Sequence, residues 1–211
     1  PGSRASAAYP FLLNTGRIRD QWHMMTRSGK AARLFAHVAE PFVEIHPDDA
    51  ANHGIAPAAL VRVASERGAI ILRALVTGGQ RKGSLFAPMH WSDEFSGRAR
   101  VDALVAGNAD PISGQPELKI TPVSLAPFRA AWQGFAVLAR RPEIPSVGYW
   151  AIAPAPAGFR LELADSAEPA DWPGFAAQLL FGGQLGDPLL HYSDTARGER
   201  RFAAFKGDRL L

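Results

Sequence analysis

The sequence predicts a mainly β protein, in which short strands form a barrel or sandwich with short helices between them, followed by a smaller α+β region. Three observations support this fold class. The chain has 211 residues and is 47% hydrophobic, which suffices for one sizeable core or one domain plus a small second one. Its 20 Gly and 17 Pro supply many turns without reaching low-complexity composition. Short apolar runs alternate with turn signals, and the regular strand–helix repeat of a doubly wound sheet is absent.

The first part of the chain contains most of the predicted strands. We expect them at residues 9–14, 41–45, 60–65, 69–77, 85–88 and 118–125. The turn Glu66-Arg67-Gly68 joins two of these runs into a hairpin. Pro47-Asp48-Asp49 opens a short helix that Gly54 can close in a left-handed conformation. These elements predict a β domain over residues 1–125.

The pattern changes at Ala126-Pro127, where a second region, residues 126–211, is expected to begin. Residues 128–138 have mixed apolar spacing, which predicts a helix at the start of this segment. Strands are expected at 149–153 and 159–163, a helix at 172–181, and a hairpin between 191–194 and 201–210 that closes around Gly198. The result is a small α+β appendage.

Composition excludes several kinds of chemistry. The chain has no cysteine, so it forms no disulfide, thiolate zinc site or cysteine-ligated iron–sulfur cluster of its own. Apolar runs are too short to span a bilayer, since even residues 69–76 are interrupted by Arg73. The first eight residues lack a secretory pattern, so a cytoplasmic location without membrane association is expected.

Positive charge is concentrated near the amino end. Residues 1–125 carry 14 Lys and Arg against 11 Asp and Glu, whereas residues 126–211 carry nine of each. Within residues 14–33, Asp20 is the single acid among five cations: Arg17, Arg19, Arg27, Lys30 and Arg33. This stretch is suited to bind an anion, although a solvated basic surface is an equally simple interpretation.

The residues of this stretch also suit a flat, phosphorylated ligand. Gly16 allows close backbone approach, Thr15 and Thr26 offer hydroxyls, and Arg17 and Arg27 can contact phosphate in bidentate fashion. Trp22 and His23 offer planar rings, and His90-Trp91 forms a second such pair. Taken singly, each Trp is more often a core residue and each His more often a structural one.

An ordered set of motifs resembles the C-terminal domain of molybdopterin oxidoreductases, and more narrowly that of assimilatory nitrate reductase catalytic subunits. The resemblance covers about residues 9–125. It is carried by Asn14-Thr15-Gly16-Arg17, Trp22-His23, Met25-Thr26-Arg27, Gly29, Phe86, His90-Trp91, Asp110-Pro111, Ser113, Gln115-Pro116-Glu117 and Lys119.

The resemblance implies a double-psi β-barrel that closes over molybdenum bis(molybdopterin guanine dinucleotide). It implies that the pterin and its phosphates are lined by Thr15, Gly16, Arg17, Trp22, His23, Thr26, Arg27, His90, Trp91 and Lys119, with Gln115 and Pro116 close by. The iron–sulfur and molybdenum-ligating cysteines of the family would lie in upstream catalytic domains. This chain would then be a fragment of a larger nitrate reductase and not catalytic alone, with a reductase or ferredoxin as electron donor.

The sequence departs from the family pattern at two positions. Met24 follows Trp22-His23 where the family usually has Thr, and Asp102 begins Asp-Ala-Leu-Val where the family has Asn-x-Leu-Thr. Asp102 would therefore place a carboxylate where an amide meets the pterin, which is unfavourable near phosphate.

Two other functions remain open. The same domain occurs in other molybdopterin enzymes, such as formate dehydrogenases. A stand-alone module for anions or nucleic acid is the second alternative, but a net charge of +3 is low for it, so we expect no nucleic-acid partner. Residues 126–211 also offer a surface for a partner reductase, which no motif tests.

Overall fold

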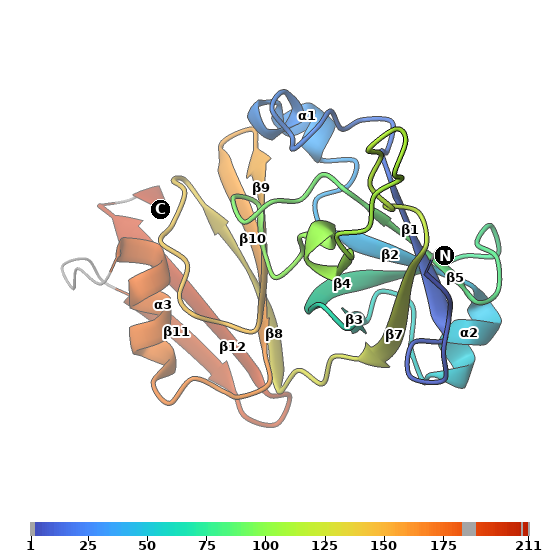
Figure 1. The fold of residues 1–211 in the computed structure, drawn as a ribbon. Helices are drawn as coiled ribbons and strands as arrows, with labels where there is room; N and C mark the ends of the chain where they lie inside the picture. The colour runs from blue at the N-terminus through green and yellow to red at the C-terminus, as the bar shows by residue number, and fades with distance from the viewer. Residues whose placement is uncertain (1–2, 183–188, 208, 211) are drawn as a thin grey trace.

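The computed structural model describes residues 3–182, 189–207 and 209–210. Its first half is a closed barrel in which the strand order is β1-β5-β2-β4-β3-β7 (Figure 1). The strands are β1 (Phe11–Gly16), β2 (Phe42–Ile45), β3 (Leu60–Ala64), β4 (Ala69–Val76), β5 (Ser84–Pro88) and β7 (Thr121–Pro127). The pairs β1–β5 and β2–β4 are parallel and the other neighbours are antiparallel.

Alternate residues of these strands fill the barrel. Leu13, Val43, Val63 and Leu85 are fully buried, and their neighbours along each strand face outward, as the period of two requires. Short helices connect the strands: η1 (Ser28–Lys30), α1 (Ala32–Phe35), α2 (Pro47–Asn52) and η2 (Val101–Leu104).

A second sheet covers one side of the barrel. Its order is β6-β9-β10-β8, with β6 (Ser96–Gly97), β8 (Trp132–Leu138), β9 (Tyr149–Ala155) and β10 (Gly158–Asp165). One face packs Tyr149, Ala151 and Ala164 against barrel residues Leu60 and Ile71. The opposite face packs against the helix α3 (Trp172–Phe181), so the sheet lies between barrel and helix (Figure 1).

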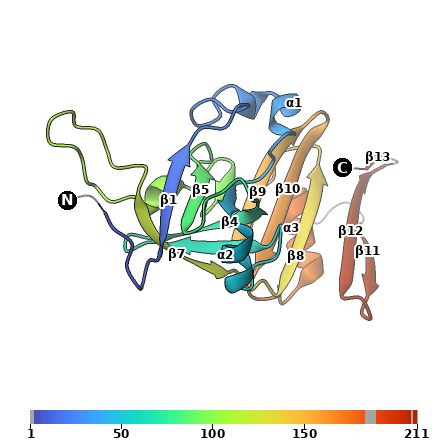
Figure 2. The ribbon, with the colours of Figure 1, turned by 90° about the vertical axis from the view of Figure 1, so that its right-hand side faces the viewer.

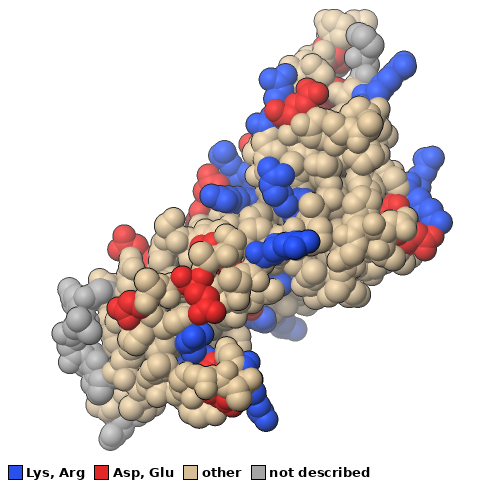
Figure 3. All heavy atoms as spheres, turned by 90° about the horizontal axis from the view of Figure 1, so that it is seen from below, with Lys and Arg blue, Asp and Glu red and all other residues tan. Residues whose placement is uncertain are grey.

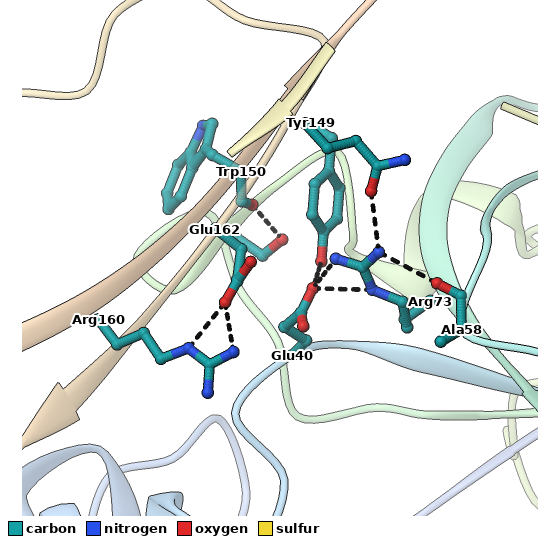
Figure 4. Close-up of polar contacts among 9 residues, drawn as sticks. Glu40, Ala58, Arg73, Tyr149, Trp150, Arg160 and Glu162 are labelled. Atoms are coloured by element: carbon teal, nitrogen blue, oxygen red, sulfur yellow. Dashed lines mark hydrogen bonds and ion pairs between the residues drawn. The ribbon is translucent and has the colours of Figure 1, made fainter. Parts of the chain in front are cut away.

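A polar cluster joins the barrel to this sheet (Figure 4). The Arg73 guanidinium on β4 donates to Glu40 Oε2 at 2.6 and 3.1 Å, and the Tyr149 hydroxyl on β9 donates to the same oxygen at 2.8 Å. Arg73 also donates to the Ala58 carbonyl at 3.1 Å and to the Gln133 side chain at 3.4 Å. Burial and the Glu40 carboxylate together raise the pKa of Tyr149 well above its usual value.

A three-stranded sheet ends the chain, with β11 (Leu189–Asp194), β12 (Glu199–Lys206) and β13 (Arg209–Leu210) in that order. Figure 2 shows it at the edge of the molecule, beside α3 and β8. Arg200 links the hairpin to the α3 region, because its guanidinium lies 5.0 Å from the Trp172 ring centroid and 3.4 Å from Glu168.

The structure confirms the mainly β fold, with a barrel followed by an α+β region. The hairpin at Gly68, the helix at Pro47 with left-handed Gly54 (φ 63°), and the helix at 172–181 are all confirmed. The double-psi crossing was implied by the resemblance and stays a prediction. So does the domain division at 125/126, a position that lies within β7.

Two predictions of local structure were wrong. The segment predicted to begin as a helix, 128–138, contains no helix, and its residues from Trp132 to Leu138 form strand β8 with alternating burial. The pairing with β10 outweighs helix propensity there. The strand predicted from Leu118 begins at Thr121, because Leu118 and Lys119 are used in contacts with the end of β1. In the predicted strand 201–210, residue 208 lies outside the described residues.

Candidate anion and cofactor site

Three chain segments meet at one end of the barrel. Strands β1 and β5 are parallel neighbours, so the loops that follow them leave the same edge. Strand β7 is antiparallel to β1, which brings the residues before Thr121 to that edge as well. Residues 17–30, here named the cationic loop, follow β1; His90 and Trp91 follow β5; and Lys119 precedes β7. The topology therefore explains why these distant motifs converge.

The end of β1 is held by the segment before β7. Thr15 is buried, and its hydroxyl donates to the Leu118 carbonyl at 2.9 Å. The Lys119 ammonium donates to the Thr15 carbonyl. Gly16 packs closely here, because a Cβ at this position would lie 3.0 Å from the Phe86 ring and would require that ring to shift. These residues shape the site, and the Thr15 hydroxyl is already used within the protein.

The cationic loop presents two guanidiniums around one indole. Trp22 is 44% exposed, and the guanidinium carbons of Arg17 and Arg27 lie 5.5 and 5.8 Å from its ring centroid. The His23 ring meets Trp22 edge-on at 4.7 Å between centroids. Among the described residues, neither Arg17 nor Arg27 has a carboxylate within ion-pair distance, whereas Arg19 pairs with Asp20 at 3.0 Å. Two unpaired cations and an open aromatic face suit a flat anion.

Two histidines of this region differ in environment. His23 is exposed, whereas His90 is fully buried. The His90 Nε2 lies 3.0 Å from the Ile18 amide, and its Nδ1 lies 2.5 Å from the His23 carbonyl. Burial lowers the pKa of His90, and the nearby Arg17 and His23 side chains lower it further, while the hydrogen bond to the His23 carbonyl partly opposes them. His90 is therefore a buried side chain that hydrogen-bonds to the backbone of the cationic loop at two points.

Buried donors without partners lie in the same region. Gln21, in the cationic loop, is 4% exposed, and its side-chain amide nitrogen has no hydrogen-bond partner among the described residues. Its oxygen accepts from Ser28. Sequence reasoning missed Gln21, although it directly precedes Trp22. Trp91 is 1% exposed and packs in the barrel core, with its indole nitrogen also unpartnered in the described chain.

Other residues expected in the site lie apart from this cluster or on its rim. The Asp102 side chain on η2 is 73% exposed and lies 3.9 Å from Arg100. Gln115 and Pro116 are exposed in the loop before β7, where Pro116 bridges to Ala109. Thr26 is exposed next to Arg27. The structure thus groups Arg17, Trp22, His23 and Arg27, supported by Thr15, Gly16, His90 and Lys119, and whether they contact a cofactor stays a prediction.

Three further observations concern surface charge, possible metal ligands and membrane-spanning helices. On the face shown in Figure 3, Lys and Arg side chains are interspersed with Asp and Glu. The described residues contain no group of three or more His, Cys, Asp or Glu side chains arranged to hold a metal ion. In the same residues, no helix has the length and apolar character needed to cross a bilayer.

Comparison with known proteins shows which family the chain resembles. The sequence profile described as "Molydopterin dinucleotide binding domain" matches residues 11–122. A nitrate reductase of Klebsiella oxytoca is 41% identical over 87% of this chain and 22% of its own length. The assimilatory nitrate reductase catalytic subunit of Bacillus subtilis is 34% identical over 61% of this chain and 18% of its own. An F420-dependent formate dehydrogenase subunit alpha of Methanocaldococcus jannaschii is 37% identical over 56% of this chain and 17% of its own.

The chain spans about a fifth of the length of these relatives. The profile match covers strands β1 to β5 and the three segments at the end of the barrel, and it stops within β7.

Proposed function

Because the chain belongs to the family of molybdopterin dinucleotide-binding domains, we propose that it forms the cofactor-covering part of a molybdenum-dependent nitrate reductase. The nitrate reductase relatives support the substrate. In this proposal, the cofactor is molybdenum bis(molybdopterin guanine dinucleotide), which the chain shares with upstream catalytic domains that carry the iron–sulfur cluster. The location is cytoplasmic, and a reductase or ferredoxin donates the electrons.

The convergence of unpaired Arg17 and Arg27 on the exposed Trp22 ring carries this proposal. A dinucleotide cofactor brings a pyrophosphate and a flat pterin, which match guanidiniums and an indole face respectively. The unpartnered amide nitrogen of Gln21 adds a buried donor in the same loop. The residues present therefore fit the group.

The chain's own residues bind and orient rather than react. Arg17 and Arg27 would hold phosphate oxygens, Trp22 would lie against a ring, and Lys119 and Gly16 would shape the approach at the end of β1. When bound, the cofactor supplies the molybdenum that exchanges two electrons and one oxygen atom with nitrate.

A double substitution in the full-length enzyme tests the proposal. We expect Arg17→Ala/Arg27→Ala to lower molybdenum per polypeptide by about tenfold or more, since each lost charge-assisted contact contributes on the order of 1.5–3 kcal/mol. Arg140→Ala is the matched control, because Arg140 is an exposed arginine of the second region. Wild-type molybdenum content in the double variant would refute the assignment.

A formate dehydrogenase remains the second candidate, because the relative from Methanocaldococcus jannaschii is 37% identical over 56% of the chain. Assay of the purified full-length enzyme with nitrate and with formate, using a dye as electron carrier, separates the two. Turnover of formate without nitrate reduction would exclude the first proposal.

A further inference from the structure

The role of His90 differs from the one that the resemblance implies. A cofactor contact needs an accessible ring edge, but His90 has 0% exposure. Both of its ring nitrogens already have partners in the protein, the Ile18 amide and the His23 carbonyl. His90 therefore has no free nitrogen to offer a ligand.

The two partners fix the tautomer of the ring. A backbone amide can only donate, so Nε2 must accept from Ile18 and carries no proton. A carbonyl can only accept, so Nδ1 carries the proton and donates to His23. His90 is a neutral imidazole that connects two points of the cationic loop, five residues apart in sequence.

The cationic loop has unfavourable backbone geometry at His23 and just after it. His23 has φ 47° and Met25 has φ 62°, both in the left-handed region that non-glycine residues rarely adopt. Met25 is 1% exposed and buried in the barrel core, and its amide donates to the Trp22 carbonyl at 3.0 Å. Such backbone geometry persists only where surrounding contacts hold it. The bond from His90 to the His23 carbonyl is one of these contacts.

We propose that His90 is a positioning residue, whose neutral imidazole clamps Ile18 and His23 so that Arg17 and Trp22 are preorganised for a phosphorylated ligand. The identity of the ligand depends on the proposed function, but the clamp, formed by His90 with Ile18 and His23, is a property of this chain alone. Preorganisation of this kind increases affinity, because the loop loses less conformational freedom on binding.

The clamp is acid-sensitive. A proton on Nε2 would remove the acceptor for the Ile18 amide and place two donors face to face. Burial disfavours an added charge on the ring, and so do the charged or titratable side chains beside it in the described structure, those of Arg17 and His23, whereas the bond to the His23 carbonyl favours it. His90 is thus neutral at pH 7, and its protonation at lower pH opens the clamp.

Amide exchange of the 211-residue chain tests the clamp without any cofactor. The probe is the Ile18 amide, followed by NMR or mass spectrometry from about pH 7.5 down to about pH 4, because burial lowers the pKa of His90 below its usual value. In the wild type, we expect protection of this amide at neutral pH and an additional, pH-linked loss of protection in acid, after correction for intrinsic exchange. Trypsin cleavage after Arg17 and Arg27 provides a second readout.

Two variants and a control separate positioning from general stability. His90→Gln keeps a distal acceptor and donor but cannot gain a proton, so we expect near-wild-type protection that no longer depends on pH. His90→Leu removes both bonds, and we expect Ile18 exchange and tryptic cleavage to accelerate by about tenfold or more. His53→Gln is the control, since among the described residues the His53 ring hydrogen-bonds to the Asp49 carbonyl at its own helix end.

The outcomes are distinguishable even if His90→Leu fails to fold. Retained pH dependence in His90→Gln, or a pH-independent Ile18 amide in the wild type, would overturn the clamp. Binding of inorganic pyrophosphate, measured by titration, should weaken in His90→Leu and not in His53→Gln. If the clamp behaves as expected but the full-length enzyme contains no molybdenum, the proposed function fails and the clamp does not.

Discussion

Substitution of Arg73 tests most directly how the barrel and the second sheet are held together. Its guanidinium donates to Glu40, Ala58 and Gln133, and the Arg73 and Glu40 side chains are 21% and 19% exposed. Removing one partner of a fully buried ion pair costs about 3–5 kcal/mol, whereas a surface pair contributes about 0–1 kcal/mol. With about four fifths of both side chains buried, we expect Arg73→Met to destabilise the protein by about 2–4 kcal/mol.

Urea unfolding followed by circular dichroism measures this change, with the slope of the transition checked for two-state behaviour. Arg73→Met/Glu40→Leu is the informative second variant, because it removes the unpaired carboxylate that the single variant leaves. We expect it to recover part of the lost stability. A loss below about 1 kcal/mol for Arg73→Met would show that water screens the pair as it does on a surface, and would refute the reasoning.

Three further outcomes follow from the structure. Gly158→Ala should cost about 2–4 kcal/mol in urea unfolding, because φ is 147° and the new Cβ would collide with the Leu138 carbonyl; a neutral result would mean that the hairpin shifts freely. Gly29→Ala should cost about 1–3 kcal/mol, since the added Cβ would lie 2.5 Å from the Phe95 ring; unchanged unfolding would contradict this close packing. Burial raises the pKa of Glu162, so the contribution of Glu162 to folding stability is most favourable below the pKa of this group in the unfolded state. Relative to Glu162→Gln, the wild type should therefore lose stability as the pH rises from about 4 to about 7. A stability difference that does not change with pH would refute that sign.

Local patterns were sufficient for much of the fold. The hairpin around Gly68 and the helix that begins at Pro47 follow from turn and capping chemistry within a few residues. The interpretation of residues 128–138 failed because that segment is a strand through its pairing with β10, more than twenty residues later. Strand β6, of two residues, has no sequence pattern of its own and was not predicted.

The candidate site was predictable in composition but not in role. Charge and aromatic content indicated Arg17, Trp22 and Arg27, and the structure brings them together. No sequence pattern distinguishes an exposed histidine from a buried one, so His23 and His90 were both expected to line the pterin. Trp91 illustrates the same limit, because its indole fills the barrel core.

Strand β6 makes the two halves of the molecule dependent on each other. It comes between β5 and η2 in the sequence, yet in the described structure it pairs with β9, and the Ser96 hydroxyl donates to the Trp150 carbonyl at 2.7 Å. During synthesis, Ser96 leaves the ribosome more than fifty residues before its partner Trp150. The outward-facing Ile71 likewise emerges well before Tyr149 and Ala164, against which it packs. The outer face of the nascent barrel therefore stays uncovered until the later sheet emerges, and a ribosome stalled before residue 149 would leave Leu60 and Ile71 exposed.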